Sequence, residues 1–377
     1  MISTITPTSS LREINFAMNS IGGKERLREK IFRGERVTPE EGVSLFEWDI
    51  PALGQAADMR RAMRVPGSEA GFIIDRIINY TNVCTAKCRF CAFHARGGVI
   101  DPYELSLDDI LEKVEGLVEI GGTQVMLQGG LHPDYGLDRY TGMLRAVRDR
   151  FPDVYLHSFS PAEIVHLSGK TGMSCGDVIG EMKEAGLNSI PGASDLLVDR
   201  IRREVSPRKM TVAQWCDVMR ALKSHGMGST ATMTYGMGET PAERIEHLDV
   251  VRSIQDETGI LRAFIPWSFS PARTMLTHIV PATGVDYLKI VAIGRIYLDN
   301  IPYIQAGWLT EGMKLAQIAL AMGANDMGGV LMEEVVVKAT GITTRTNMDE
   351  MIDLIKNAGK IPVRRDSEYR AVEIYRD

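Results

Sequence analysis

The sequence has 377 residues and a formal net charge of −6 at pH 7, and its 44% hydrophobic and 24% charged content is that of a soluble globular protein. Its length suits one α/β barrel with extensions. The absence of a basic block, of an apolar run of the roughly 20 residues that span a bilayer, and of a secretion signal argues against nucleic-acid and membrane partners and predicts a cytoplasmic location.

Residues 1–70 are predicted to form a helical N-terminal extension. Short helices are expected at Leu11–Met18, Lys24–Phe32 and Pro51–Met63. Thr38 followed three residues later by Glu41 is the pattern of a capping box at a helix start. This segment has no catalytic motif, so we interpret it as a helical layer that packs against the following domain.

From Phe72 onward, strand and helix patterns alternate. Eight strands are predicted, at Phe72–Tyr80, Thr123–Leu127, Val154–Phe159, Leu187–Ile190, Ser229–Tyr235, Leu261–Trp267, Tyr303–Trp308 and near Ala324–Asp326. Helices are predicted at Ser106–Ile120, Asp138–Arg150, Gly176–Ala185, Thr211–His225, Glu239–Glu257, Tyr287–Asn300, Lys314–Met322 and Met348–Ala358. This alternation predicts parallel strands with right-handed crossovers, and eight of them close a (β/α)8 TIM-type barrel. We therefore expect a barrel over residues 71–360 and a short C-terminal extension over 361–377.

Three cysteines follow the first predicted strand at short spacing: Cys84, Cys88 and Cys91. Three thiolates within eight residues can face one inorganic centre if the loop wraps around it. Three soft ligands leave one iron of a 4Fe–4S cubane open to a small molecule. A zinc site is the alternative, but structural zinc takes four ligands, and only His94 stands near enough to complete the set.

The two other cysteines, Cys175 and Cys216, stand alone in the sequence. A free cysteine usually packs as a small apolar residue, and we interpret both in this way. A disulfide framework is not expected in a chain of this length with five cysteines and no secretion signal.

The segment INYTNVCTAKCRFCAF resembles the cluster motif of the radical S-adenosylmethionine (SAM) enzymes. This resemblance implies a 4Fe–4S cluster on Cys84, Cys88 and Cys91, whose open iron binds the amino and carboxylate groups of SAM. An electron from the cluster would cleave the sulfonium and release a 5′-deoxyadenosyl radical. The resemblance also implies that Phe90, directly before the third cysteine, lies near the adenine.

A Gly-Gly pair ends the second predicted strand, where barrel enzymes place their sites. It resembles the glycine motif that receives the amino group of SAM, although Leu131 replaces the usual acidic third residue. For the glycine pair, a plain tight turn is the alternative. Arg202 could hold a carboxylate, and a place on an exposed helix face is the alternative for it. The predicted cofactor-binding residues besides Phe90 are Gln128, Gly129, Gly130, Ser158, Ser194 and Arg202.

The last three predicted strands carry polar and aromatic residues at their ends. If the barrel closes, these share one mouth with the cysteines. The predicted substrate-binding residues are Trp267, Ser268, Gln305, Trp308 and Asn325. Trp267 could cover an aromatic or nucleoside substrate, and core packing is the alternative.

The resemblance extends from about residue 42 to residue 369. Its segments are LQGGLHPD, GLNSIPGAS, TATMTYGMGET, QDETGILRAFIPWSFSP, LDNIPYIQAGW and GANDMGG. They are similar to the radical SAM enzymes of the menaquinone and deazaflavin pathways, and above all to the family of cyclic dehypoxanthinyl futalosine synthases. The loop His94–Gly98 departs from the Arg-rich or Tyr-containing loop of that family.

This closer resemblance implies a reaction on dehypoxanthine futalosine. The radical would remove a hydrogen from its ribose, the ribosyl radical would add to the benzoate ring, and loss of an electron and a proton would restore aromaticity. The sequence leaves the proton acceptor open among His157, Glu163, Tyr235 and Asp326. Glu163 could instead serve the start of a helix or bind a hydroxyl.

The resemblance also implies an electron donor such as flavodoxin or ferredoxin. Two alternative functions stay open on the same barrel: aminofutalosine synthase and deazaflavin-cofactor synthase. A non-enzymatic iron–sulfur or zinc protein is an alternative of another class.

Overall fold

The computed structural model describes residues 21–333 and 335–376, so the helix predicted at Leu11–Met18 lies outside the described chain. Strand β1 (Glu69–Asn79) is where the barrel closes. It pairs in parallel with β2 (Gln124–Gln128) and with β8 (Asp326–Leu331).

The remaining strands complete the ring. Strand β2 pairs with β3 (Tyr155–Leu156), and a second sheet contains, in order, β4 (Ser189–Ile190), β5 (Gly228–Tyr235), β6 (Leu261–Ser268) and β7 (Tyr303–Ile304). Parallel bridges between His157 and Ser189 and between Gln305 and Asp326 join the two sheets. The predicted (β/α)8 barrel is therefore confirmed, with all eight of its strands parallel.

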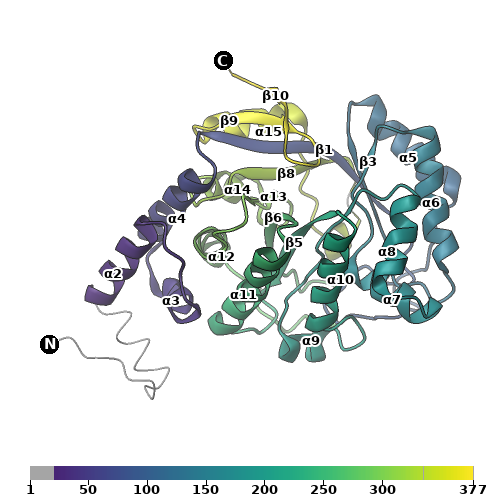
Figure 1. Cartoon of the computed structure of the whole chain (residues 1–377), viewed down its shortest axis with the longest axis horizontal. Helices are drawn as coiled ribbons and strands as arrows, with labels where there is room; N and C mark the ends of the chain where they lie inside the picture. The colour runs from purple at the N-terminus through teal and green to yellow at the C-terminus, as the bar shows by residue number, and fades with distance from the viewer. Residues whose placement is uncertain (1–20, 334, 377) are drawn as a thin grey trace.

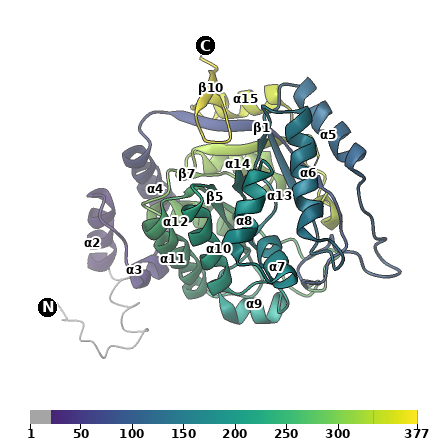
Figure 2. The same ribbon diagram turned by 45° about the vertical axis from the view of Figure 1, so that its right-hand side comes forward.

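Helices cover the outside of this barrel, as Figures 1 and 2 show. They are α5 (Leu107–Glu119), α6 (Leu137–Arg150), α7 (Pro161–Thr171), α8 (Cys175–Glu184), α9 (Asp199–Val205), α10 (Val212–Ser224), α11 (Pro241–Thr258), α12 (Gly284–Tyr297), α13 (Trp308–Glu311), α14 (Met313–Ala319) and α15 (Met348–Asn357). Helix α5 shows why: Ile110, Val114 and Leu117 recur at helical spacing and are buried. No described helix is long and apolar enough to cross a membrane.

The described part of the N-terminal segment is helical, with α2 (Ile21–Phe32), α3 (Pro39–Ser44) and α4 (Ile50–Arg64). The predicted capping box is present, because the Thr38 hydroxyl accepts from the Glu41 amide and the Glu41 carboxylate accepts from the Thr38 amide. Figures 1 and 2 show these helices beside α11 and α12.

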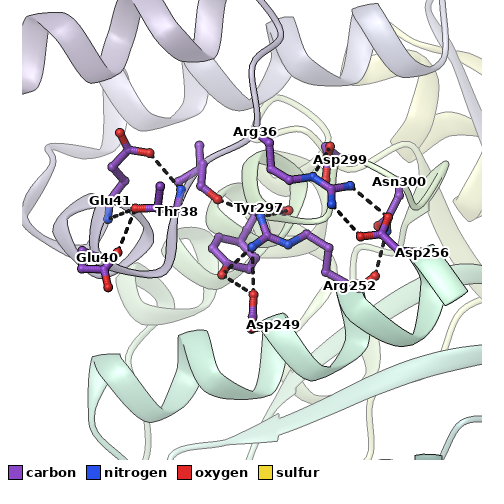
Figure 3. A network of polar contacts seen from close by, with 11 residues as sticks. Arg36, Thr38, Glu40, Glu41, Asp249, Arg252, Asp256, Tyr297, Asp299 and Asn300 are labelled. Carbon is purple, nitrogen blue, oxygen red and sulfur yellow. Dashed lines mark hydrogen bonds and ion pairs between the residues drawn. The ribbon is translucent and has the colours of Figure 1, made fainter.

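Polar contacts hold this segment to the barrel helices (Figure 3). Arg36 pairs with Asp256 and, at 3.0 Å, with Asp299. The Arg252 guanidinium lies 3.8 Å from the centre of the Tyr297 ring and donates to the Val37 carbonyl. The attachment therefore combines solvent-exposed ion pairs of Arg36 with a hydrogen bond from the buried Arg252, whose guanidinium packs on the Tyr297 ring.

The C-terminal segment forms a hairpin at the opposite end of β1 from the cysteines. Its strand β9 (Ile361–Arg365) pairs in parallel with Glu69–Phe72, and β10 (Ala371–Ile374) pairs antiparallel with β9. The hairpin thus lies at the base of the barrel, where β1 begins (Figure 1). The domain boundaries proposed at residues 70 and 360 stay predictions.

Two predicted strand boundaries were wrong near the end of the barrel. Strand β7 ends at Ile304, and Trp308 begins helix α13. Strand β8 begins at Asp326, where the prediction ended it. Asn325 and Asp326 therefore stand at the base of the barrel, and this change matters for their predicted roles.

A buried ion pair fastens the hairpin to the barrel. Arg365 donates through two nitrogens to Asp326, one bond measuring 2.9 Å, and both side chains are almost completely buried.

Replacing Arg365 with Met should lower the free energy of unfolding by about 3–5 kcal/mol, because the buried carboxylate of Asp326 loses its partner. Chemical denaturation measures this loss, and the double variant Arg365→Met/Asp326→Asn should recover most of it. Arg36→Ala is the control: its side chain is 45% exposed, so its loss should cost no more than about 1 kcal/mol. Equal losses in Arg365→Met and Arg36→Ala would contradict this account.

Candidate functional site

A cavity of about 460 Å³ runs through the interior of the barrel. One end is lined by the cysteine loop (residues 80–94), which follows β1. The other end is lined by side chains from the first residues of the strands and from the C-terminal hairpin. The predicted site residues that line it are Cys84, Cys88, Cys91, Phe90, Gln128, Gly129, Gly130, His157, Glu163, Trp267, Ser268, Gln305 and Trp308.

The cysteine loop is held against the end of β2 by backbone contacts. The amide and hydroxyl of Thr85 both donate to the Leu131 carbonyl, at 2.9 and 3.0 Å. In return, the Leu131 amide lies 3.3 Å from the Cys84 sulfur, and the Phe93 amide lies 3.4 Å from the Cys91 sulfur. Such N–H donors stabilise negative charge on thiolate sulfur.

The donor set fits an iron–sulfur cluster. Burial raises the pKa of Cys88 to about 12 and also raises the pKa of Cys91, so bare thiolates are disfavoured unless metal charge offsets the burial. No three His, Cys, Asp or Glu side chains of the described chain surround a single metal position. His94 lines the cavity but does not complete a one-ion site, whereas a cubane places each thiolate on its own iron.

The glycine pair lies directly under this loop. A Cβ on Gly130 would lie 2.2 Å from the Val83 carbonyl oxygen and 2.8 Å from the Cys84 Cβ. A Cβ on Gly129 would lie 2.5 Å from the Tyr80 ring. Glycine is therefore required at both positions by packing within the protein, in addition to any approach of a ligand.

Glu163 stands at a helix start and binds hydroxyls of the protein itself, and its binding of a ligand hydroxyl stays a prediction. It stands in the first turn of α7, whose N-cap Ser160 accepts from its amide, and its carboxylate accepts from the hydroxyls of Tyr80 and Ser160. Burial raises its pKa to about 7, against the opposing effect of these hydrogen bonds and one from the Gly129 backbone. The carboxylate thus lies beside the glycine pair and faces the cavity.

Lys209 and Asp195 also line this end of the cavity, although the sequence patterns did not single them out. The Lys209 ammonium lies 2.6 Å from the Asp195 carboxylate and 5.8 Å from the centre of the Phe90 ring. The contact orients the ring that was predicted to lie near adenine.

The predicted substrate side of the cavity contains two tryptophans fixed by hydrogen bonds. The indole of Trp267 donates to the Thr234 hydroxyl at 2.9 Å, and that of Trp308 donates to the Gly329 carbonyl at 3.1 Å. Ser268 lies beside Trp267, and its amide donates to Glu311. These contacts set the orientation of both rings along the cavity wall.

The structure does not support ligand contact for six predicted residues, none of which lines the cavity: Ser158, Ser194, Arg202, Tyr235, Asn325 and Asp326. For three of them, the position on or beside a strand explains why the side chain does not face the cavity. Ser158 and Tyr235 stand next to inward-facing residues and point the other way, because alternate residues face opposite sides of a strand. Ser194 exchanges hydrogen bonds with Thr232.

The other three serve the framework. The Arg202 guanidinium is buried and donates to the carbonyls of Ser194, Leu196 and Met210. The Asn325 side chain accepts from Arg295 and from the Ile304 amide. The Asp326 carboxylate is paired with the Arg365 guanidinium.

The base of the cavity contains polar residues that the sequence patterns missed: Asp75, Gln124, Arg262, Arg365 and Tyr369. The Tyr369 hydroxyl accepts from Gln305 at 2.9 Å, and its ring stacks on Tyr303 with 4.2 Å between centres. One signal was available, because Asp75 is a charged residue within the apolar strand FIIDRII.

Comparison with known proteins matches two family models: the Radical SAM superfamily over residues 78–251 and the CofH/MqnC C-terminal region over 257–377. The chain is 41% identical to the cyclic dehypoxanthine futalosine synthase of Halalkalibacterium halodurans, covering 93% of this chain and 95% of that protein. It is 42% identical to that of Streptomyces coelicolor, covering 91% and 88%. The chain belongs to the radical SAM superfamily.

Another similar protein has a different name. The chain is 41% identical to the 5-amino-6-(D-ribitylamino)uracil–L-tyrosine 4-hydroxyphenyl transferase of Archaeoglobus fulgidus, over 84% of this chain and 92% of that protein. Among solved structures, methylornithine synthase covers 90% of this chain and is itself covered to 97%, at TM-score 0.72 and 18% identity. The structure of the hydrogenase maturase HydG of Carboxydothermus hydrogenoformans covers 96% of this chain, and the match covers 84% of HydG. Its TM-score is 0.75 and its sequence identity is 16%. The structural likenesses support the barrel.

Proteins of the radical SAM superfamily use a 4Fe–4S cluster and SAM, which agrees with the cofactors predicted from the sequence. Cys84, Cys88 and Cys91 would hold the cluster. Cys175 and Cys216 do not line the cavity and pack against the hydrophobic core.

Replacing Gly130 with Ala should reduce the cluster content of the radical SAM protein, because the new Cβ would displace the backbone at Val83 and Cys84. Iron and sulfide analysis after anaerobic reconstitution measures this loss. Gly142→Ala is the matched control: its Cβ would meet nothing within 4 Å, and the helix should gain about 0.5–1 kcal/mol. If folded Gly130→Ala holds as much iron as Gly142→Ala, the glycine pair does not position the cysteine loop.

Proposed function

We propose that this chain is a cyclic dehypoxanthine futalosine synthase, which closes the ribose of dehypoxanthine futalosine onto its benzoate ring in menaquinone biosynthesis. The observation that carries the proposal is the extent of the similarity: the two named synthases match more than nine-tenths of this chain, and the CofH/MqnC C-terminal region matches residues 257–377, which include the C-terminal hairpin. The cysteine loop, the barrel strands and the hairpin all line one cavity, so the similarity reaches both ends of the pocket.

When bound, the cluster and SAM supply a radical that removes a hydrogen atom, after an electron arrives from a donor such as flavodoxin or ferredoxin. The chain has to place the ribose near the cysteine loop and keep other hydrogen donors away. On the cofactor side, Gln128, Phe90 and the glycine pair would line the SAM pocket, and Glu163 would accept from hydroxyls of its ribose.

The walls further along the barrel would hold the substrate. Trp267 and Trp308 are rigid aromatic surfaces in the cavity wall, which suit packing against the carbon skeleton of the substrate and help to exclude water. Gln305, held by Tyr369, and Ser268 would add hydrogen bonds. Holding both reacting parts of one substrate in contact converts ring closure into a favourable intramolecular step.

The reaction also needs a proton acceptor, and the described geometry narrows the choice. Tyr235 and Asp326 do not line the cavity. Asp75 lines it, is almost completely buried, and has one carboxylate oxygen without a hydrogen-bond partner among the described residues. Its other oxygen accepts from Gln124. We propose Asp75 as the group that takes the ring proton.

The function is tested by anaerobic incubation of the reconstituted protein with dehypoxanthine futalosine, SAM and a reductant. The expected products are the cyclised futalosine, methionine and 5′-deoxyadenosine. The relative from Archaeoglobus fulgidus supports a second candidate, so L-tyrosine with 5-amino-6-(D-ribitylamino)uracil forms a parallel incubation, as does an enolpyruvyl benzoate for aminofutalosine synthase. Adduct formation in either parallel incubation, with no cyclised futalosine, would reject the proposal.

Replacing Asp75 with Asn should lower the rate of cyclised product roughly 10²–10⁴-fold, the usual contribution of a general base. Burial raises the pKa of Asp75 to about 7, so the wild-type rate should rise with pH through about 7 as the carboxylate loses its proton. The variant should lose this rise while it still forms 5′-deoxyadenosine, because hydrogen removal comes earlier.

Glu163→Gln is the control for this experiment, since the pKa of Glu163 is also raised to about 7. It should weaken SAM binding and retain the pH dependence that comes from Asp75. A pH profile that is lost in Glu163→Gln and kept in Asp75→Asn would reverse the two assignments.

A further inference from the structure

Arg262, the second residue of β6, is an unusual cation at the base of the cavity. Its guanidinium donates to the Tyr155 hydroxyl at 3.0 Å and to the Ser189 hydroxyl at 2.9 Å, both neutral groups. The other Arg and Lys side chains that line the cavity, Arg365 and Lys209, each have a carboxylate partner. Within the described chain, Arg262 has none, so its charge inside the barrel is not neutralised.

The Ser189 hydroxyl lies between Arg262 and His157 and fixes which nitrogen of the His157 ring carries the hydrogen. The Ser189 hydroxyl lies 2.6 Å from His157 Nδ1 and accepts from Arg262, which has no lone pair to offer in return. Within the described chain, Nδ1 is the acceptor within reach of the Ser189 proton. Nδ1 therefore accepts that proton.

The second ring nitrogen of His157 must then carry the hydrogen of the neutral ring. Burial, with the charges of Arg262 and Arg365, lowers the pKa of His157 well below its ordinary value, so the ring is neutral. Because Nδ1 accepts, Nε2 is the N–H donor. His157 was one of four predicted proton acceptors, and this arrangement makes it a hydrogen-bond donor instead.

We infer that Arg262 and His157 form an anion site at the base of the cavity that binds the aryl carboxylate of the substrate. The inference rests on the proposed function and adds the orientation of the substrate to it. An unneutralised guanidinium and a neutral N–H donor are the groups that bind a carboxylate by charge-assisted hydrogen bonds.

The position of this site sets the direction of the substrate. Trp267 stands five residues after Arg262 on the same strand, which is roughly 16 Å at the usual rise of a parallel strand. A carboxylate at Arg262 therefore directs the benzoate ring along the barrel and the ribose toward the cysteine loop. Asp75 lines the same end of the cavity from β1, where it can reach a proton of the ring.

The test uses a pair of ligands of nearly the same shape, one with a charged carboxylate and one with a neutral amide in its place. Anaerobic calorimetry on the reconstituted protein compares 3-acetylbenzoate with 3-acetylbenzamide. Wild type should bind the acid about 10- to 100-fold more tightly, the effect of one or two hydrogen bonds to a charged group. Arg262→Met should lose this preference and bind the amide as wild type does. L-Tyrosine, whose carboxylate sits on an amino acid, should bind more weakly than 3-acetylbenzoate.

Further variants separate the anion site from general damage. Arg200→Met removes a half-exposed arginine that is paired with Glu243 outside the cavity, and it should keep the preference for the acid. His157→Gln, which retains an N–H donor, should keep more of the preference than His157→Leu. Ser189→Ala frees the His157 tautomer and should weaken acid binding a few-fold with Arg262 in place.

Turnover then links the site to the reaction. Arg262→Met should raise the KM for dehypoxanthine futalosine and leave SAM affinity unchanged.

Three results would overturn the inference: equal binding of acid and amide by wild type, tighter binding of L-tyrosine than of 3-acetylbenzoate, or an unchanged preference for the acid in folded Arg262→Met. If Arg262→Met does not fold, the binding of the acid and the amide by wild type and by Ser189→Ala still tests the anion site. Wild type that forms no cyclised product rejects the proposed function, whereas normal turnover with no acid preference rejects this site alone.

Discussion

Strand β1 makes hydrogen bonds with three other strands, and the architecture of the site depends on them. Its pairing with β2 and β8 closes the barrel, and its pairing with β9 attaches the C-terminal hairpin. One end of β1 leads into the cysteine loop, and the other end lies beside the hairpin that carries Arg365 and Tyr369. A single rigid strand therefore fixes how far the cluster loop lies from the base of the cavity, and so where a substrate that contacts both ends places its reacting groups.

The charges inside the barrel are divided by function. Arg365 and Lys209 are neutralised by carboxylates, and they hold the hairpin and the wall near Phe90. Within the described chain, Arg262 has no carboxylate partner, and one oxygen of the buried Asp75 carboxylate has no hydrogen-bond partner, which costs free energy. Polar groups left unsatisfied in an otherwise paired interior are typical of sites that complete their bonding with a ligand. The two lie at the same end of the cavity, where the account places the benzoate.

Sequence reasoning succeeded where the chemistry is local. The three cysteines stand within eight residues and line one end of the cavity, and the alternation of strands and helices predicted the barrel. The glycine pair lines the cavity, and its predicted contact with a cofactor stays a prediction; the structure adds a reason for glycine that no local pattern contains, the packing of Val83 and Tyr80 against it. Asn325 and Asp326 moved to the base because the strand was predicted to end at Asp326, which is where β8 begins.

Other misses have similar physical causes. Tyr235 and Ser158 are neighbours of residues that face the cavity, and a shift of one residue turns a side chain to the opposite face of a strand. Asp75 was a charged residue in an apolar strand and could have been recognised as unusual. Tyr369 could not have been found in this way, because its place in the cavity depends on the hairpin folding beneath the barrel.

The central claim is that one cavity holds the substrate lengthwise, with its ribose at the cysteine loop and its carboxylate at the base. Electron–nuclear double resonance of the reduced cluster, with a non-cleavable SAM analogue and ¹³C-labelled dehypoxanthine futalosine bound, measures this directly. The account predicts a clear dipolar coupling to ¹³C in the ribose and none resolved to ¹³C in the carboxylate. A coupling to the carboxylate carbon as large as that to the ribose would contradict it.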